Sequence, residues 1–229
     1  MPRTNPARRR SLTDAAITLL ASDGVHGLTH RSAERAAGLP AGTASNYFRS
    51  REELLVAAAE RIVELHLADM ERADTAAARS AAEQPEPTSP DVVQLIAASL
   101  EAAASAQRDR YLAVFELTLE SRRRPALTSA LARLAGGAAG FTGDQHAELG
   151  FEVPPRAVPL LITLYGGALF TLVTGPHMPG GPTAHDLARA IVAGALAATA
   201  DGGDDGGSDG DRDGTHVGRH PDGTPASPV

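Results

Sequence analysis

Apolar residues recur at helical spacing through most of the chain, from about residue 11 to residue 199. Leu12, Ala16 and Leu19, for example, lie three or four positions apart and would form one stripe along a helix. No run of β-branched residues alternates with polar ones, as a half-buried strand requires. Aromatic residues make up only 3% of the chain, which favours close-packed helices over sheets. The sequence therefore predicts an all-α fold.

Missing residue types and spacings exclude several classes of protein. The 229 residues include no cysteine, which excludes a disulfide scaffold, a thiolate metal site and a cysteine nucleophile. The eight histidines form neither an H-E-x-x-H nor an E-x-x-H pair, so we expect no metal and no cofactor. We expect no enzymatic activity either. An enzyme with a helical-bundle fold is a less favoured alternative function, because these spacings are missing. The basic, polar start lacks the apolar stretch of a secretory signal, which predicts a cytoplasmic protein.

Charge is divided unevenly along the chain, whose formal net charge is −7. Residues 1–53 carry eight arginines against five acidic residues, whereas residues 200–229 carry two arginines against seven acidic residues. A basic front on an acidic protein predicts one end that binds a polyanion. By composition we divide the chain into a basic arm (1–10), a segment of short helices (11–53), a body of long helices (54–199) and an acidic, Gly/Asp-rich tail predicted to be disordered (200–229).

Four helices are expected in the front of the chain, each from local start and stop signals. Ser11 begins a capping box for the first helix, and Gly24 can end that helix with a positive φ. Thr29 is the candidate N-cap of the second, and Ser50 with Glu53 forms a capping box for the fourth. The expected spans are about residues 12–22, 30–37, 41–47 and 50–79, of which the last carries two apolar stripes and would connect front and body.

The rest of the folded region predicts a body of longer helices after a proline-rich linker at residues 83–90. Segment 157–173 is uncharged and borderline in length for a membrane span. It contains Pro159 and a glycine pair, however, and an amphipathic helix that Thr183 and Asp186 would cap follows it. We therefore expect no membrane contact and a dimer interface instead. The expected body helices cover about residues 91–106, 108–123, 127–138, 157–173 and 183–198.

The three short helices, with Gly38-Leu39-Pro40 between the second and third, fit a helix-turn-helix. Residues 11–56 resemble the DNA-binding signature of the TetR/AcrR family of transcriptional regulators. The matching residues are Gly27-Leu28-Thr29, Ala33, Ala36-Ala37-Gly38, Gly42-Thr43, Tyr47-Phe48 and Ser50-Arg51-Glu52-Glu53-Leu54-Leu55. The resemblance implies a helix-turn-helix head joined by a long helix to a helical body that binds an effector and dimerises. It also implies a double-stranded, palindromic DNA operator, a small-molecule effector and a homodimer through the helices at about 156–174 and 184–199.

Helical spacing and the resemblance together predict the DNA-binding residues. Ala44 and Phe48 lie four apart and would face inward, which turns Ser45 and Asn46 toward the bases. Glycine at position 42 lets the backbone approach DNA. The resemblance adds a phosphate contact at Thr29 and a base contact at Arg31. The full predicted set is Arg8, Arg9 and Arg10 in an arm along phosphates or in a minor groove, Thr29, Arg31, Ala41, Gly42, base-reading Ser45 and Asn46, and phosphate-binding Thr43, Tyr47 and Arg51.

The chain departs from the family pattern at four positions. The family usually has a serine at Pro40, a large apolar residue at Ala44, an aromatic residue at Ser45 and a lysine at Arg51. These changes leave the operator sequence open. The alternative interpretation of the basic arm is a solvated tail that makes no specific contact and is attracted to DNA only diffusely.

The effector site leaves no motif, so its residues are proposed from the expected helices alone. Glu116 lies beside aromatic residues and is either a polar handle for a ligand or a solvent-exposed charge. An effector in this site would shift the fourth helix, change the spacing of two heads and release DNA. An architectural DNA-binding protein without an effector is the alternative. The predicted pocket residues are His66, Met70, Leu100, Tyr111, Phe115, Glu116 and Phe141.

Overall fold

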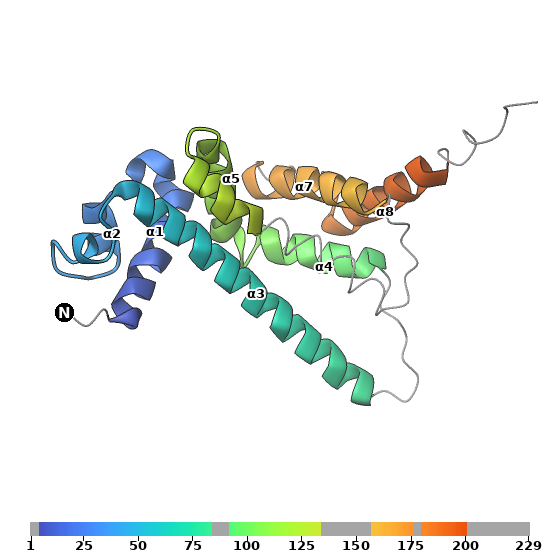
Figure 1. Ribbon diagram of the computed structural model, residues 1–229. Helices are drawn as coiled ribbons and strands as arrows, with labels where there is room; N and C mark the ends of the chain where they lie inside the picture. Colours follow the sequence, from blue (N-terminus) through green and yellow to red (C-terminus); the bar gives the residue numbers. More distant parts are fainter. Residues whose placement is uncertain (1–4, 84–91, 134–156, 176–179, 201–229) are drawn as a thin grey trace, which may run out of the picture.

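The computed structural model describes residues 5–83, 92–133, 157–175 and 180–200, and every regular element among them is helical. Several predicted features fall wholly or mostly outside these ranges: the linker at 83–90, Phe141, residues 134–138 of one helix and the tail after residue 200. Figure 1 shows a head at the N-terminal end, a long diagonal helix, and a body of shorter helices above it. The all-α prediction is confirmed.

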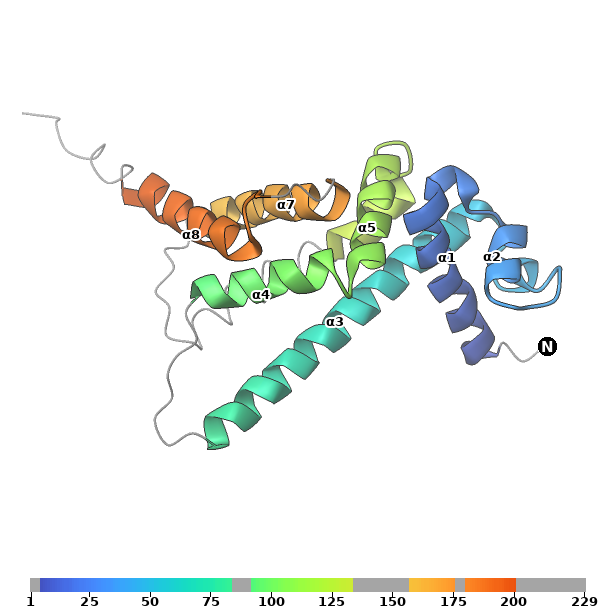
Figure 2. The same ribbon diagram turned by 180° about the vertical axis from the view of Figure 1, so that it is seen from behind.

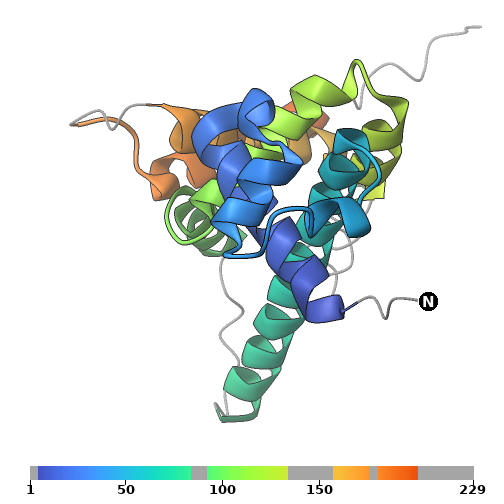
Figure 3. The same ribbon diagram turned by 90° about the vertical axis from the view of Figure 1, so that its left-hand side faces the viewer.

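The head comprises α1 (Pro6–Gly27), α2 (His30–Ala36), the short 3-10 helix η1 (Ala44–Asn46) and the first turns of α3 (Arg51–Glu83). Figure 3 views this group from the head side. Leu12 and Leu20 of α1 are buried together with Leu54 and Leu55 of α3. The same apolar cluster includes Leu117 of α5 and residues of the helical stretch 125–133, so that the head and part of the body share one core.

The first helix begins earlier than predicted and includes the basic residues. The Asn5 side chain accepts the backbone N–H groups of Ala7 and Arg8, and Pro6 occupies the first turn of the helix. This pair is a strong helix start, because the asparagine satisfies free amides and proline has none there. Ser11 is consequently inside the helix, where its hydroxyl donates to the Ala7 carbonyl, and it is not the predicted cap. Residues 6–10 therefore do not form the extended arm that was predicted.

A glycine breaks the regular path of α1 near its end. Gly24 has φ 67° and ψ −174°, a conformation in which a side chain would be strained. The expected positive φ at this position is confirmed, and a further turn continues to Gly27. The break directs the chain into α2, whose Thr29 N-cap and end at Ala36 also follow the prediction closely.

The third predicted helix is shorter than expected. A helix was predicted over residues 41–47, whereas only Ala44–Asn46 form a 3-10 turn. Gly42 has φ 83°, which a right-handed helix does not allow, so regular structure begins only after it. The segment nevertheless presents its side chains as predicted.

The long helix α3 runs without interruption through the predicted boundary at residues 53 and 54. Ser50 caps it by accepting the Glu53 backbone N–H at 3.1 Å. The Glu53 carboxylate accepts the Arg49 N–H at 2.7 Å rather than that of Ser50, so the capping box is shifted by one residue. The uninterrupted helix confirms the expected connector and extends it to Glu83.

The body contains α4 (Val92–Ala104), α5 (Arg108–Ser121), the helical residues 125–133, α7 (Val158–Thr174) and α8 (Ala184–Ala200). Figure 2 shows α7 and α8 side by side above α4. These helices enclose a second apolar cluster that includes Leu100, Leu161 and Ile191. The predicted cap of α8 is present, since the Asp186 carboxylate accepts from the Thr183 N–H at 3.0 Å. Among the described helices, none combines the length and apolarity that a membrane crossing requires.

One body helix lies directly against the head. Of all the helix pairs described, α5 and α1 pack against each other most extensively. Figure 1 shows α5 between the head and the group of α4, α7 and α8. The head is thus held from two sides, through the continuous α3 and through the packing of α5.

Candidate nucleic-acid interface

The short η1 segment presents two polar side chains over two buried anchors. Ala44 is 0% exposed and Phe48 is 2% exposed, whereas Ser45 and Asn46 are exposed. The Phe48 N–H donates to the Ala44 carbonyl at 2.9 Å, which keeps the turn closed. Asn46 can offer one acceptor and two donors to a base edge, and Ser45 a hydroxyl. The orientation predicted for these four residues is therefore present.

A buried glutamate, which the sequence reasoning missed, fixes this segment. Glu34 of α2 is 5% exposed, and its Oε1 accepts the backbone N–H of Ala44 at 2.7 Å. A carboxylate that accepts a backbone N–H in a buried setting makes a strong, directional contact. The available signal was a lone acidic residue directly after buried Ala33, on the inner face of a short helix. Glu34 thereby joins the two helical pieces of the helix-turn-helix.

The surface around Gly42 is open. A Cβ built at this exposed glycine would meet no heavy atom within 4 Å. The glycine is therefore required by its positive φ and not by internal packing. An open backbone beside Ser45 and Asn46 is compatible with close approach of a ligand.

Four further residues of the predicted DNA-binding set fall into two groups. Arg31 and Ala41 are exposed and available. Thr29 accepts the Ser32 N–H at 3.0 Å as the cap of α2, and the Thr43 hydroxyl donates to the Pro40 carbonyl at 2.6 Å. These hydrogen bonds hold the two hydroxyl groups at the start of α2 and at the turn before η1. Their contacts with DNA stay predictions.

Tyr47 connects the reading segment with the start of α1. Its hydroxyl oxygen accepts the backbone N–H of Asn5 at 3.2 Å, which leaves the phenolic proton free to be donated. The contact brings the first turn of α1 beside η1. A phosphate contact at Tyr47 would therefore lie next to Arg8, Arg9 and Arg10, which are exposed.

Arg51 makes a different contact from the predicted one. Its Nε donates to the Leu28 carbonyl at 2.7 Å, and its Nη2 donates to the Val25 carbonyl. The guanidinium group therefore closes the corner between α1 and α2, where carbonyl groups at a helix end lack partners. The position at the N-terminus of α3 suggested a phosphate contact, but the structure directs this side chain inward.

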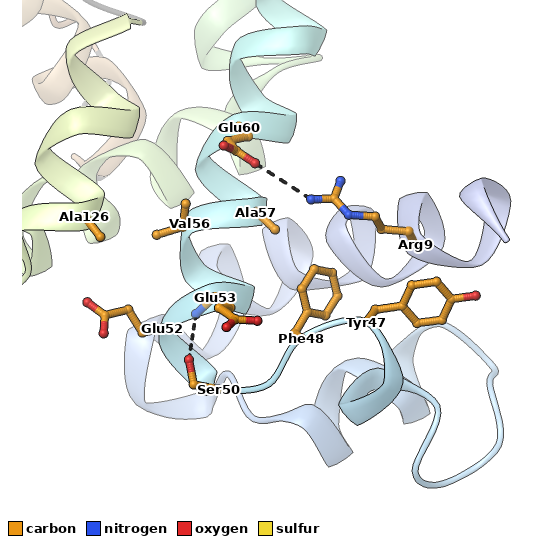
Figure 4. A pocket seen from close by; sticks show the side chains of 10 residues that line it. All are labelled: Arg9, Tyr47, Phe48, Ser50, Glu52, Glu53, Val56, Ala57, Glu60 and Ala126. Carbon is orange, nitrogen blue, oxygen red and sulfur yellow. Dashed lines mark hydrogen bonds and ion pairs between the residues drawn. The ribbon is translucent and has the colours of Figure 1, made fainter. Parts of the chain in front are cut away.

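Arg9 lies at the edge of a hollow of about 500 Å³ between the head and the residues after α5. Its guanidinium carbon is 5.6 Å from the centroid of the Phe48 ring, and Nη2 is 3.8 Å from Glu60 Oε2. Glu60 also accepts from Arg133 at 3.1 Å. Figure 4 shows Arg9 extending from α1 toward Glu60 across the hollow. The exposed ion pair is weak, so the Arg9 charge can be redirected toward a polyanion.

The structure brings three of the predicted pocket residues into the second apolar cluster, namely Leu100, Tyr111 and Phe115. Phe115 meets Phe170 edge to face, with ring centroids 5.0 Å apart. Tyr111 is hydrogen-bonded to Tyr165, whose hydroxyl is 2.7 Å from Ser99 Oγ. Burial raises the pKa of Tyr111 well above its ordinary value, so this phenol stays neutral. A chain of hydroxyl groups thus crosses an apolar, aromatic environment.

A polar cluster joins α3 to α5 one turn from Tyr111. Asp69 forms an ion pair with Arg110 and accepts from Gln107 Nε2 at 3.1 Å. His66 lies on the same helix as Asp69, and burial together with the positive charge of Arg110 lowers its pKa. Met70, another predicted pocket residue, is half-buried beside Asp69 in the sequence. The acidic side chain on this side of the body is therefore neutralised by an arginine.

Glu116 makes a contact that neither sequence-based interpretation predicted. Its Oε2 accepts the backbone N–H of Val25 at 3.0 Å, across 91 positions of sequence. The carboxylate also lies 3.1 Å from the position of a Cβ added to Gly24. The solvent-exposed alternative for Glu116 is wrong, because the side chain is half-buried against α1, whereas its role as a polar handle for a ligand stays a prediction.

Comparison with known proteins follows this division into head and body. Residues 12–58 match the family model described as bacterial regulatory proteins of the tetR family. Residues 87–198 match the model described as the C-terminal domain of tetracyclin repressor-like proteins. Among curated proteins, none matches the chain.

Solved structures resemble the chain over most of its length. The multidrug binding protein EbrR in complex with ethidium is 26% identical, with a TM-score of 0.56, and the match covers 82% of this chain and 98% of that chain. A TetR-family member from Streptomyces coelicolor A3 is 27% identical, with a TM-score of 0.57 and coverages of 83% and 98%. A transcriptional regulator from Rhodococcus sp. Rha1 shares the fold at 17% identity, with a TM-score of 0.60 and coverages of 85% and 95%.

Proposed function

The chain belongs to the TetR family of transcriptional regulators, which are DNA-binding proteins and not enzymes, and we propose that it is a homodimeric repressor that a small molecule releases from a palindromic operator. DNA binding through the head is a property of the family. The response to an effector, the palindrome and the dimer are our proposals.

The observation that carries this proposal is the exposed pair Ser45 and Asn46 on a turn that buried Ala44, Phe48 and Glu34 hold in place. Side chains that read bases need a fixed backbone, because discrimination depends on the geometry of paired donors and acceptors. We assign Asn46 to a base edge, preferably adenine N6 and N7, and Ser45 to a neighbouring base. Arg31, at the exposed start of α2, would add a third contact.

The affinity for DNA would come mainly from contacts with phosphate groups. Arg8, Arg9 and Arg10 lie on the first turns of α1, and Tyr47 contacts the N–H of Asn5 at the start of this helix. Thr29 and Thr43 would contact phosphates beside them. Because such contacts release counterions, operator binding should weaken steeply as salt rises. Arg51 is omitted from this group since its Nε and Nη2 donate to carbonyl groups within the protein.

The effector would bind in the body near Tyr111 and Phe115. Aromatic rings and neutral hydroxyl groups favour a largely apolar ligand with a few hydrogen-bonding groups. EbrR, a similar protein, has been solved in complex with ethidium, which supports a ligand site in a body of this kind. Helices α7 and α8 would form the homodimer interface, with exposed apolar side chains such as Ile162 and Phe170 available for it.

Selection of bound sequences from random duplex DNA tests the proposal. The wild-type protein should enrich a palindromic consensus, and Asn46→Ala should relax the same position in both halves. Ser22→Ala, on an exposed position of α1 away from η1, is a matched control that should enrich the wild-type consensus. Failure of the folded wild-type protein to enrich any sequence would contradict the proposal, as would an unchanged consensus for Asn46→Ala.

A further inference from the structure

The corner between α1 and α2 is held by charged side chains from two other helices. Gly24 interrupts the helical hydrogen-bond ladder, so the Val25 N–H lacks the usual acceptor one turn earlier. The Glu116 carboxylate of α5 accepts this N–H at 3.0 Å. On the other side of the same residue, the Val25 carbonyl accepts from Arg51 of α3. The Val25 backbone therefore lies between an acid from the body and a base from the connector.

Contacts continue from this corner to the reading segment without a gap. Arg51 also donates to the Leu28 carbonyl at 2.7 Å, and Leu28 directly precedes the Thr29 cap of α2. At the other end of α2, Glu34 accepts the Ala44 N–H at 2.7 Å, next to Ser45. A displacement of the corner would therefore move α2 and, through Glu34, the segment that carries the reading side chains.

A second side of α5 faces the proposed effector site. Phe115 immediately precedes Glu116 and meets Phe170 of α7 at a centroid distance of 5.0 Å. Tyr111, one turn earlier, is hydrogen-bonded to Tyr165 of the same helix α7. Neighbouring residues on a helix point about 100° apart, so one rigid helix carries both an effector-facing ring and a head-facing carboxylate.

We infer that Glu116 is a positioning residue through which α5 holds the head in its operator-binding arrangement. A rotation of α5 by about 20° moves a group about 6 Å from the helix axis by about 2 Å. That displacement is enough to break the hydrogen bond between Glu116 and the Val25 N–H. A ligand that pushes on Phe115 would thereby release the corner, which couples two sites through one rigid helix. The inference deepens the proposed function and rests on it.

Three substitutions of Glu116 in the full chain separate the effects of side-chain length, charge and hydrogen bonding. Glu116→Ala removes the acceptor, Glu116→Asp keeps the charge on a side chain one methylene shorter, and Glu116→Gln keeps an acceptor of the same length. Glu120→Ala is the matched control, because this carboxylate lies one turn further on α5 and pairs with Arg123 and Arg124, which lie outside the head. Glu120→Ala should lower the free energy of unfolding without changing a contact between α5 and the head.

The first measurement is amide-resolved hydrogen exchange of the free protein. In the Ala and Asp variants the Val25 amide should exchange about tenfold faster than in the wild type, while the amides of α5 keep their protection. The Gln variant and Glu120→Ala should retain protection at Val25. Unchanged exchange at Val25 in Glu116→Ala would overturn the contact itself.

The second measurement is the ratio of affinities for the selected operator and a scrambled duplex. The Ala and Asp variants should lower this ratio at least fivefold, and Gln should restore most of it. Partial unfolding alone would lower the active fraction for both duplexes and leave the ratio unchanged, which would overturn a positioning role. If the wild type itself shows no preference between the duplexes, the proposed function fails, whereas a wild-type preference that Glu116→Ala retains refutes the role of Glu116 alone.

Discussion

Removal of the Glu34 side chain should loosen the reading segment from α2. In Glu34→Ala the buried Ala44 N–H loses an acceptor at 2.7 Å, and Ala44 itself is 0% exposed. An orphaned buried donor costs about 1–3 kcal/mol, so we expect the free energy of unfolding to fall by about 2 kcal/mol. For a chain of this length, that loss corresponds to a decrease of about 4–8 °C in Tm.

Urea unfolding at one fixed protein concentration measures this loss, because the stability of a dimer depends on concentration. Glu34→Gln keeps an acceptor of similar size and should lose less than half as much as Glu34→Ala. The exposed neighbour Arg35 supplies the control, and Arg35→Ala should stay within about 0.5 kcal/mol of the wild type. The reasoning is refuted if Glu34→Ala unfolds like the wild type, or if Glu34→Gln costs as much as Glu34→Ala.

The remaining predictions concern the α1–α2 corner, the body and the dimer. Arg51→Gln should lower the free energy of unfolding by about 1–3 kcal/mol, because it removes charged donors from two carbonyl groups, yet leave the salt dependence of operator binding unchanged; a shallower salt dependence would restore Arg51 as a phosphate contact. His66 has a lowered pKa in the folded protein, so the unfolded chain binds more protons below the ordinary pKa of histidine, about 6.5. Stability should therefore be fully present at pH 7.5 and decline toward pH 5.5, and His66→Gln should flatten this decline in a series of Tm measurements; an equal decline in the variant contradicts the assignment. Ile162→Glu places a charge on an α7 residue that is 37% exposed and should give monomers in sedimentation analysis, whereas an intact dimer would remove α7 from the proposed interface.

Local sequence signals predicted most helix ends correctly. The caps at Thr29, Ser50 and Thr183 depend on residues within three positions, and each is present in the structure. The earlier start of α1 had an equally local signal, because Asn5 followed by proline at position 6 is a strong N-terminus. The first two turns of α1 carry polar, basic residues and no apolar stripe, and this composition suggested an arm instead of a helix.

Long-range contacts could not be predicted in the same way. Glu116 and the Val25 N–H are 91 positions apart, and Arg51 and the Leu28 carbonyl are 23 apart. Helical periodicity showed which side of α5 is apolar, but not which neighbour its carboxylate would meet. The outward direction of Ser45 and Asn46 was predictable, because it follows from two apolar residues four positions apart.

The central claim is that Asn46 discriminates between sequences while arginines such as Arg9 only add affinity. Dissociation constants for the selected operator and a scrambled duplex, measured at several salt concentrations, test it most directly. Asn46→Ala should lower the ratio of the two affinities about tenfold or more, with little change in salt dependence. Arg9→Gln should weaken both complexes equally and reduce the salt dependence. A ratio that survives Asn46→Ala, or that falls with Arg9→Gln, would contradict the account.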